Sequence, residues 1–279
     1  MKKLRLYTGF LLVLAFVYTG GALSQHVEWL ADYQKARELA AKENKLMLLD
    51  FWASWCGPCI RMDDQTWNQW PIIFDCKKFV CVRVNFDQSI MLNRAYDVEA
   101  IPALVLTDAF GKKLYHLVGF MSSAEVHSVL GMLPEKMAVV YDLLRRLQQH
   151  PDSVQLNITL GDAYRILRMP QVSNEYYEEF LKVGMKDPDP KTEDHVRTGQ
   201  AVNYDLLGKS DDARELLEEQ VRVCPASAFR PLQLFLLVKL YNLDEEEDLA
   251  RASFEALKKE FPGDKATLAA EQLLRNKKD

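Results

Sequence analysis

The sequence lacks the compositional features of several protein classes. It has 12 glycines and 11 prolines in 279 residues, too few for a collagen-like or low-complexity chain. Its five cysteines are too few for a small domain held together by disulfides. It has no excess of positive charge, with 35 Lys and Arg against 40 Asp and Glu. Binding to nucleic acid or to an anionic membrane surface is therefore not expected.

The composition that remains is ordinary for a globular protein. Hydrophobic residues make up 48% of the chain and charged residues 27%. With typical domains of about 100–150 residues, the length predicts two domains. The negative charge is concentrated in the second half, because residues 138–279 hold 26 acidic and 20 basic side chains.

A single long apolar run lies at the N-terminus. Lys2, Lys3 and Arg5 precede an uncharged, mostly apolar run of 18 residues over 6–23, which ends in small residues. This order is typical of a signal peptide, and we expect cleavage just before Gln25. An uncleaved membrane anchor is the alternative, since the run is close to the minimum length that spans a bilayer. Either reading predicts that the rest of the chain lies outside the cytoplasm, in the periplasm, where disulfides persist.

The next hundred residues alternate between strand and helix patterns. Four short apolar runs bounded by turns are predicted to be buried strands, at residues 46–52, 79–84, 103–106 and 113–118. Helical stretches are predicted around them, at residues 28–44, from 58 onward, 89–96 and 122–133. Strands that alternate with helices predict an α/β fold in which helices cover both faces of the sheet.

After Pro134 the pattern is helical to the C-terminus, and it repeats. Three segments share the order small, Tyr, small, large, in the aligned sets Gly161/Tyr164/Ser173/Tyr177, Ala201/Tyr204/Ala213/Leu217 and Val238/Tyr241/Ala250/Phe254. Pro225 and Pro262 close the second and third copies. This spacing resembles the tetratricopeptide repeat, a helix–turn–helix unit of 34 residues.

These patterns predict two architectures in series. We assign residues 1–25 to the signal peptide, 26–137 to an α/β domain and 138–279 to an all-α domain of tetratricopeptide-like repeats. A connecting helix is expected at 135–149 and a capping helix at 265–275. A generic helical bundle is the alternative for the last domain, because a repeat register can be fitted by eye.

The segment Trp55-Cys56-Gly57-Pro58-Cys59 indicates chemistry. A Cys-x-x-Cys pair alone fits half a zinc site, a structural disulfide or a redox dithiol. Here it follows an apolar strand and precedes a helix, so Cys56 stands at a helix N-terminus, where the dipole and unpaired N–H groups favour a thiolate. Pro58 suits the first helical turn. Because Cys59 lies one turn further on, the pattern predicts an exposed nucleophile, Cys56, and a shielded resolving thiol, Cys59.

The residues around this pair resemble the thioredoxin superfamily. The resemblance covers residues 28–133 and rests on Asp50–Cys59, Arg83–Asp87, Ile101–Ala103 and Gly119. Within the superfamily, the leading helix, Met62-Asp63 and Val118–Met121 more closely resemble the periplasmic C-terminal domain of the membrane-bound reductant of the bacterial Dsb system. The resemblance implies a thioredoxin-like mixed sheet of five strands with helices on both faces. It also implies a cis peptide between Ile101 and Pro102 that faces the dithiol.

The resemblance further implies a role for each residue of the site. Cys56 attacks a substrate disulfide and Cys59 resolves the mixed disulfide, with no cofactor or metal ion. Asp50, in a strand that is otherwise apolar, resembles the buried acid that exchanges a proton with the second cysteine, since burial raises a carboxyl pKa. A carboxylate merely satisfied at a strand end is the alternative. The residues implied to border the substrate groove are Trp55, Ile101, Pro102 and Gly119.

We therefore predict an extracytoplasmic thiol–disulfide oxidoreductase that reduces disulfides in proteins. A reductase in that compartment needs a membrane-spanning electron donor, and the helical repeats are expected to hold a peptide or protein ligand. One alternative is a binding adaptor or chaperone that uses the thioredoxin-like domain as a scaffold. Another is a disulfide isomerase or oxidant, and the reduction potential of the cysteine pair distinguishes these from a reductase.

Cys76 and Cys81 extend the pair to C-x2-C-x16-C-x4-C. The last spacing is wrong for a zinc knuckle, which argues against a zinc site. A disulfide between Cys76 and Cys81 and two buried thiols are both open, because neighbouring elements do not guarantee bridging distance. Cys224 has no obvious partner.

Overall fold

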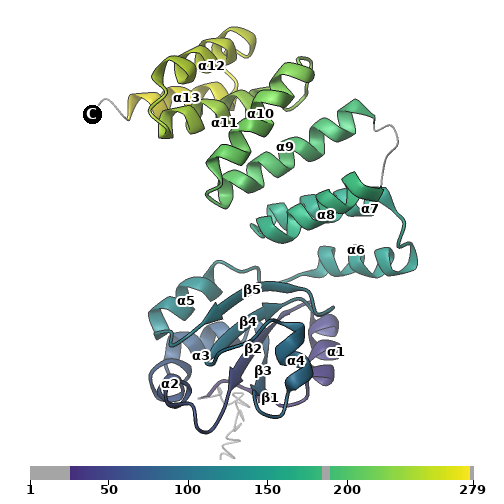
Figure 1. The fold of residues 1–279 in the computed structure, drawn as a ribbon, viewed down its shortest axis with the longest axis vertical. Coiled ribbons are helices and arrows are strands. Elements are labelled where there is room, and N and C mark those ends of the chain that lie inside the picture. The colour runs from purple at the N-terminus through teal and green to yellow at the C-terminus, as the bar shows by residue number, and fades with distance from the viewer. Residues whose placement is uncertain (1–25, 184–188, 277–279) are drawn as a thin grey trace, which may run out of the picture.

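The computed structural model describes residues 26–183 and 189–276. Figure 1 shows an α/β part followed by an all-helical part, as the sequence predicts. The predicted signal peptide, residues 1–25, lies outside the described residues. Within the described ranges, no helix has the length and apolar character needed to cross a bilayer.

The α/β part is built on a mixed sheet of five strands in the order β1-β3-β2-β4-β5. β3 is parallel to both β1 and β2, whereas β4 is antiparallel to β2 and β5. The sheet therefore confirms the topology implied by the resemblance. The strands are β1 (Trp29–Leu30), β2 (Leu46–Trp52), β3 (Phe79–Asn85), β4 (Ala103–Thr107) and β5 (Lys113–Val118).

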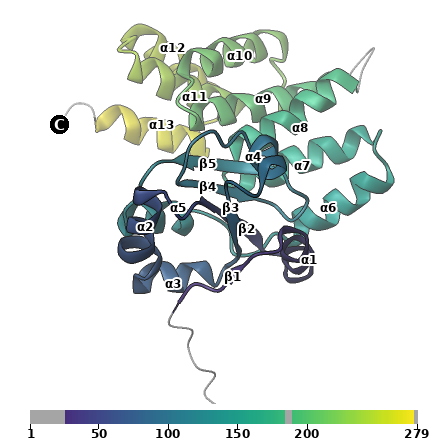
Figure 2. The ribbon, with the colours of Figure 1, turned by 60° about the horizontal axis from the view of Figure 1, so that its bottom comes forward.

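Helices cover both faces of this sheet. α1 and α4 lie on one side, and α2, α3 and α5 lie on the other (Figures 1 and 2). A short π-helix, η1, continues directly from α2. The bounds of these elements are α1 (Tyr33–Glu43), α2 (Gly57–Met62), η1 (Asp63–Trp67), α3 (Trp70–Cys76), α4 (Ile90–Ala95) and α5 (Ser123–Gly131).

The start of the chain differs from the helix predicted at 28–44. Residues 29–30 form the edge strand β1, and the helix begins only at Tyr33. Asp32 caps it, because its side chain accepts hydrogen bonds from the backbone N–H groups of residues 34 and 35 at 2.9 and 3.0 Å. The backbone of Trp29 instead pairs with Cys81 in β3, a partner far away in the sequence.

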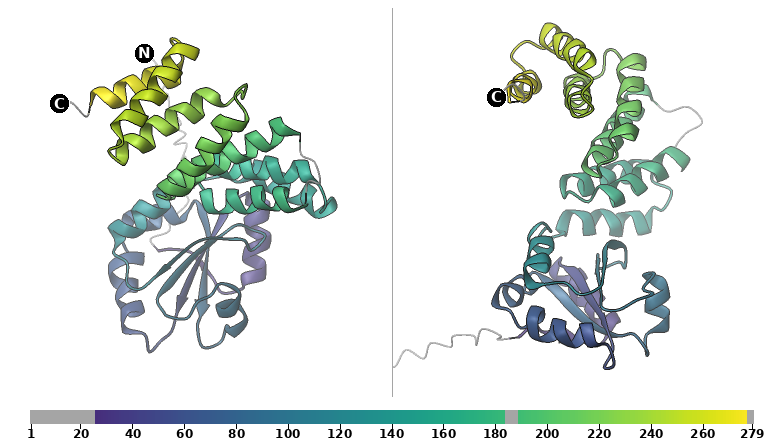
Figure 3. Two further views of the ribbon diagram at one scale, coloured as in Figure 1. Left: turned by 45° about the horizontal axis from the view of Figure 1, so that its top comes forward. Right: turned by 60° about the vertical axis from the view of Figure 1, so that its left-hand side comes forward.

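The all-helical part begins with α6, which corresponds to the connecting helix. The next helices pack mainly as pairs, α7 with α8, α9 with α10 and α11 with α12. Figure 3 shows that they continue away from the sheet as a curved stack. The last helix coincides with the predicted capping helix, while the tetratricopeptide type of the repeat stays a prediction. The bounds are α6 (Ala138–Gln149), α7 (Val154–Ile166), α8 (Pro170–Val183), α9 (Pro190–Leu206), α10 (Ser210–Val223), α11 (Arg230–Leu243), α12 (Glu247–Glu260) and α13 (Lys265–Arg275).

The helices join the α/β part through a shared interior. Tyr141 of α6 is fully buried, donates a hydrogen bond to the carbonyl of Lys45 at 2.7 Å and accepts one from the N–H of Ala109 at 2.9 Å. Tyr164 of α7 donates to Asp108 at 3.0 Å, and burial raises the pKa of that carboxyl. One hydrophobic cluster runs from the sheet through α6 and α7. The domain border at 137/138 stays a prediction.

Tyr177 of α8 fills the space between α7 and α9. A Cβ atom on Gly161 would lie 2.4 Å from its ring, and one on Gly199 would lie 2.7 Å away. Because Tyr177 is fully buried and donates a hydrogen bond to Asp162 at 2.6 Å, the ring cannot turn aside freely. This contact explains why the first aligned position holds a glycine in the first copy, where the other two copies have Ala201 and Val238.

We expect Gly161→Ala to destabilise the protein by about 2–3 kcal/mol, since the added methyl overpacks a closed interior. Urea denaturation of the full chain measures this change. Gly131→Ala in α5 is the matched control, because a Cβ there meets no atom within 4 Å. Equal effects of the two substitutions would contradict the close approach at Tyr177.

Candidate active site around the Cys56–Cys59 pair

The strand–turn–helix arrangement predicted for the cysteine motif is confirmed. β2 ends at Trp52, the N–H of Cys56 donates to the carbonyl of Ala53 at 3.1 Å, and α2 begins at Gly57. Cys56 is the N-cap residue of α2, and its sulfur accepts a hydrogen bond from the N–H of Cys59 at 3.2 Å. The sulfur thus takes the place of a usual capping oxygen.

Cys56 and Cys59 form a disulfide with their Cα atoms 5.3 Å apart. Cys56 is 3% exposed and Cys59 is 2% exposed. The prediction of an exposed Cys56 is therefore wrong for this oxidised form. The reason is that Cys56 turns its sulfur back over the first turn of α2, against Ala53 and the half-buried Ile101.

The structure brings Ile101 and Pro102 to the disulfide, in the cis form that the resemblance implied. Among the described residues, the backbone N–H and C=O of Ile101 have no hydrogen-bond partner. The N–H of Gly119 donates to the carbonyl of Pro102 at 2.8 Å. Gly119 has φ +97°, a conformation that favours glycine, so the residue type is dictated by the backbone at this point.

Trp55 is 65% exposed next to the buried disulfide. Its indole N–H donates to a carboxylate oxygen of Asp87 at 2.9 Å. Asp87 follows β3 and belongs to the segment that carried the resemblance, but the sequence did not assign it a role. The hydrogen bond fixes the orientation of an apolar ring at the surface beside the cysteines.

Asp50 lies in the middle of β2 and is buried. Its Oδ2 is 3.1 Å from Nε of Arg83, but the N–H does not point at that oxygen, so the two form an ion pair without a hydrogen bond there. Burial outweighs the attraction of Arg83 and raises the pKa of Asp50 to about 7. A carboxyl group that titrates near neutral pH can both take up and release a proton at working pH.

Arg83 and Asp63 belong to the same charge cluster. Both lie in segments that carried the resemblance, but the sequence did not assign either of them a role. Arg83 lies over the rings of Trp29 and Trp52, with 5.6 and 4.6 Å from its guanidinium carbon to the ring centres. It donates a hydrogen bond to Asp63 of η1 at 2.5 Å. The negative charge of Asp63 adds to the rise in the pKa of Asp50. One available signal was that Arg83 is the single charged residue of β3.

Cys76 and Cys81 are separate thiols, and both are buried. Cys81 donates a weak hydrogen bond to the carbonyl of Cys76 at 3.6 Å. The pKa of Cys81 is raised well above its ordinary value. The largest cause is a hydrogen bond with the Cys76 thiol, and the second is burial. Such a thiol is a poor nucleophile. In residues 26–183 and 189–276, no group of three or more His, Cys, Asp or Glu side chains could hold a metal ion.

Comparison with known proteins decides the family of the α/β part. A family model described as thioredoxin-like matches residues 28–109. The thioredoxin of Griffithsia pacifica is 33% identical over 105 residues, which are 37% of this chain and 77% of that protein. The chain belongs to the thioredoxin family. With its Cys56–Cys59 disulfide, this thioredoxin-family protein is a thiol–disulfide oxidoreductase.

Two further relatives come from the Dsb group of proteins. The thiol:disulfide interchange protein DsbD of Vibrio vulnificus is 30% identical over 99 residues, which are 33% of this chain but 17% of that protein. A solved structure described as a DsbH oxidoreductase is 27% identical, with a TM-score of 0.35, and the match covers 38% of this chain and 83% of that one. The thioredoxin-like family model ends at residue 109, so helices α6–α13 stand outside it.

Proposed function

We propose that this thioredoxin-family protein reduces disulfides of other proteins outside the cytoplasm. The observation that supports it most is the Cys56–Cys59 disulfide at the start of α2, packed against Ile101. The extracytoplasmic location is supported by the basic and then apolar order of residues 1–25. The similarity to a DsbD protein, named for thiol:disulfide interchange, supports the same chemistry.

In the proposed reaction, Cys56 of the reduced protein attacks as a thiolate. A bond forms between its sulfur and one sulfur of the substrate disulfide, and the other substrate sulfur leaves as a thiolate that takes up a proton. Cys59 then attacks the sulfur of Cys56, which releases the second substrate thiol and leaves the Cys56–Cys59 disulfide. Two electrons have moved to the substrate, so a reductant must convert the Cys56–Cys59 disulfide back to the dithiol. Because the protein is proposed to lie outside the cytoplasm, we expect this reductant to be a membrane-spanning dithiol donor.

Asp50 is proposed to accept the proton of Cys59 before the second attack. Its pKa of about 7 means that it is partly ionised at neutral pH and can act as a base. Arg83 forms an ion pair with Asp50 and so stabilises its ionised form in the buried site. The same guanidinium also forms an ion pair with Asp63. We therefore assign Arg83 as a positioning residue.

The substrate is proposed to lie across Trp55, Ile101, Pro102 and Gly119. The unpaired backbone groups of Ile101 support this, because an extended substrate chain could hydrogen-bond to them next to the disulfide. The helices α6–α13 are proposed to hold a protein partner. Stacked helix pairs that form a concave surface support that role.

The reduction potential of the cysteine pair tests the proposed direction of electron flow. The full chain is equilibrated in glutathione or dithiothreitol buffers, and the dithiol fraction is measured by alkylation. We expect a value near the thioredoxin potential of about −270 mV. A value of about −120 to −180 mV would identify an oxidant or an isomerase instead. If no reversible dithiol titrates, the adaptor or chaperone interpretation replaces the reductase.

A further inference from the structure

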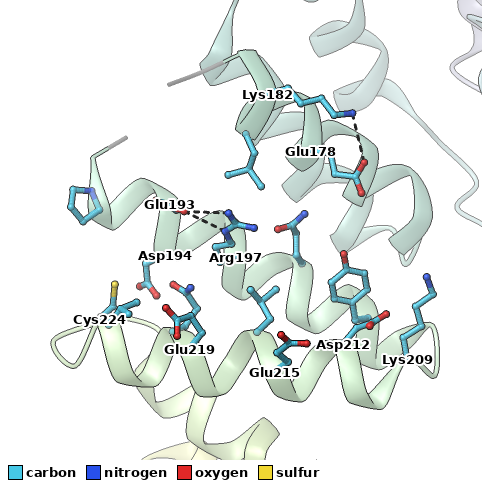
Figure 4. Close-up of a pocket in the computed structure, with 17 residues that line it drawn as sticks. Glu178, Lys182, Glu193, Asp194, Arg197, Lys209, Asp212, Glu215, Glu219 and Cys224 are labelled. Carbon is cyan, nitrogen blue, oxygen red and sulfur yellow. Dashed lines mark hydrogen bonds and ion pairs between the residues drawn. The ribbon is translucent and has the colours of Figure 1, made fainter. Parts of the chain in front are cut away.

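A groove of about 1040 Å³ lies between α8, α9 and α10 (Figure 4). It lies where the first helix pair of the stack packs against the second. Small-molecule sites have about 300–1,000 Å³. The groove therefore has room for a segment of polypeptide.

The walls of the groove are predominantly acidic. Among residues 26–183 and 189–276, six carboxylates line it, against three cations. Two of the cations are engaged within the walls, where Glu178 pairs with Lys182 and Glu193 pairs with Arg197. The carboxylates are Glu178, Glu193, Asp194, Asp212, Glu215 and Glu219.

The α10 wall carries the unbalanced charge. Asp212 and Glu215 have no ion pair or hydrogen bond from their side chains to any described residue. Burial is the largest cause that raises the pKa of Tyr204, and the negative charges of Glu178 and Asp212 raise it further. Carboxylates therefore act on this ring from both α8 and α10. The groove consequently attracts positive charge and repels acidic peptides and nucleic acid.

Two buried amides line the same groove. Gln200 of α9 is 3% exposed and Gln220 of α10 is 5% exposed. Neither side chain has a hydrogen-bond partner in the described part of the chain. Their amide atoms are not among the fully buried atoms that lack a partner, so they reach the space of the groove, where each amide offers two donors and one acceptor to a ligand. The backbone of an extended peptide presents the matching N–H and C=O groups at regular intervals.

We infer that the groove between α8, α9 and α10 binds an extended basic segment of a protein. Gln200 and Gln220 hydrogen-bond its main chain, and Asp212 and Glu215 pair with its Lys or Arg side chains. Leu216 and other apolar lining residues contact the aliphatic parts between them. This assignment rests on the proposed docking role of the helices and names the partner's chemistry.

Fluorescence anisotropy of a labelled peptide tests this assignment on the full chain. The probe is a short peptide in which Arg and Leu alternate, and the comparison peptide has Glu in place of Arg. We expect saturable binding of the basic peptide alone. The double variant Asp212→Asn with Glu215→Gln should weaken it about tenfold. Equal binding of the acidic peptide, or no binding of either, would overturn the assignment.

Glu38→Gln with Glu255→Gln is the matched control for charge. Both residues are exposed, they lie on α1 and α12, which do not line the groove, and the change in net charge is the same. This control should change the affinity less than about twofold, since charges beyond about 10 Å are screened at ordinary salt. If it weakens binding as much as the groove variant, the attraction comes from overall charge and the groove is not the site.

The variant Gln200→Leu with Gln220→Leu tests the main-chain contacts. It removes two buried amides without opening a large space, so folding should be kept, and urea denaturation checks this. We expect about tenfold weaker binding with an unchanged dependence on salt. Unchanged affinity would remove the amides from the assignment.

Reduction of a small disulfide is measured on the same preparations. Lost peptide binding with intact disulfide reduction would overturn only the assignment of the groove as a peptide site. Lost reduction with intact peptide binding would overturn the proposed reductase alone. The two proposals therefore fail separately.

Discussion

Asp50→Asn should make the protein more stable at pH 8, by about 2–4 kcal/mol. The pKa of Asp50 is about 7 in the folded protein, against an ordinary value of 3.8. Above pH 3.8 the unfolded chain loses this proton more readily, so the folded state loses stability steadily until the pH passes 7. Asparagine does not titrate and removes this loss. Arg83 keeps its hydrogen bond to Asp63 in the variant.

Urea denaturation over a pH series measures this effect. The gain from Asp50→Asn should be near zero below about pH 4 and should level off above about pH 7. Asp64→Asn is the control, because Asp64 is an exposed carboxylate in the neighbouring η1 and should give no such pH-dependent gain. A loss of stability at pH 8, or a gain that does not depend on pH, would show that Asp50 is not a buried acid with a raised pKa.

The same substitution should slow the reaction even though the fold is more stable. Without a base for Cys59, release of the mixed disulfide is expected to slow by about a hundredfold. Rapid-quench measurement of the mixed disulfide separates this step from the first attack. An unchanged release rate would favour the alternative in which Asp50 is only a satisfied carboxylate.

Cys56→Ser should abolish disulfide reduction entirely, whereas Cys59→Ser should retain the first attack and stop there. A serine hydroxyl does not attack disulfides, so no bond to the substrate forms without Cys56. Without Cys59 the mixed disulfide cannot be resolved and accumulates as one substrate per protein molecule. Insulin as substrate, with adducts detected by non-reducing electrophoresis and mass spectrometry, measures both outcomes.

The double variant Cys56→Ser with Cys59→Ser controls for other thiols and should form no adduct. Cys76→Ala should react like the unaltered chain, since the Cys76 thiol is buried. Full activity in Cys59→Ser would remove its resolving role. If Cys56→Ser lost disulfide reduction but kept binding of a protein partner and function in the cell, this would favour the adaptor interpretation, in which the thioredoxin-like part is a scaffold.

The sequence by itself determined the order of the elements and the position of the chemistry. β2, β3, β4 and β5 follow apolar runs whose limits are set by neighbouring turns. The placement of Cys56 between a strand and a helix also follows from local pattern, because capping and proline preferences act within a few residues. The change from strands to helices after the sheet is likewise predicted by a change in the spacing of apolar residues along the chain.

Tertiary structure alone decided the contacts between distant segments. The edge strand β1 forms because the backbone of Trp29 and Leu30 pairs with β3. Two residues are too few to show the alternating apolar pattern that predicts a strand. The raised pKa of Asp50 depends on burial and on a balance between Arg83 and Asp63, which three separate elements bring together. Burial and ion pairing depend on distance in space, which local sequence preferences do not encode. The same reason explains why the acidic groove of α8–α10 became visible only in the folded stack.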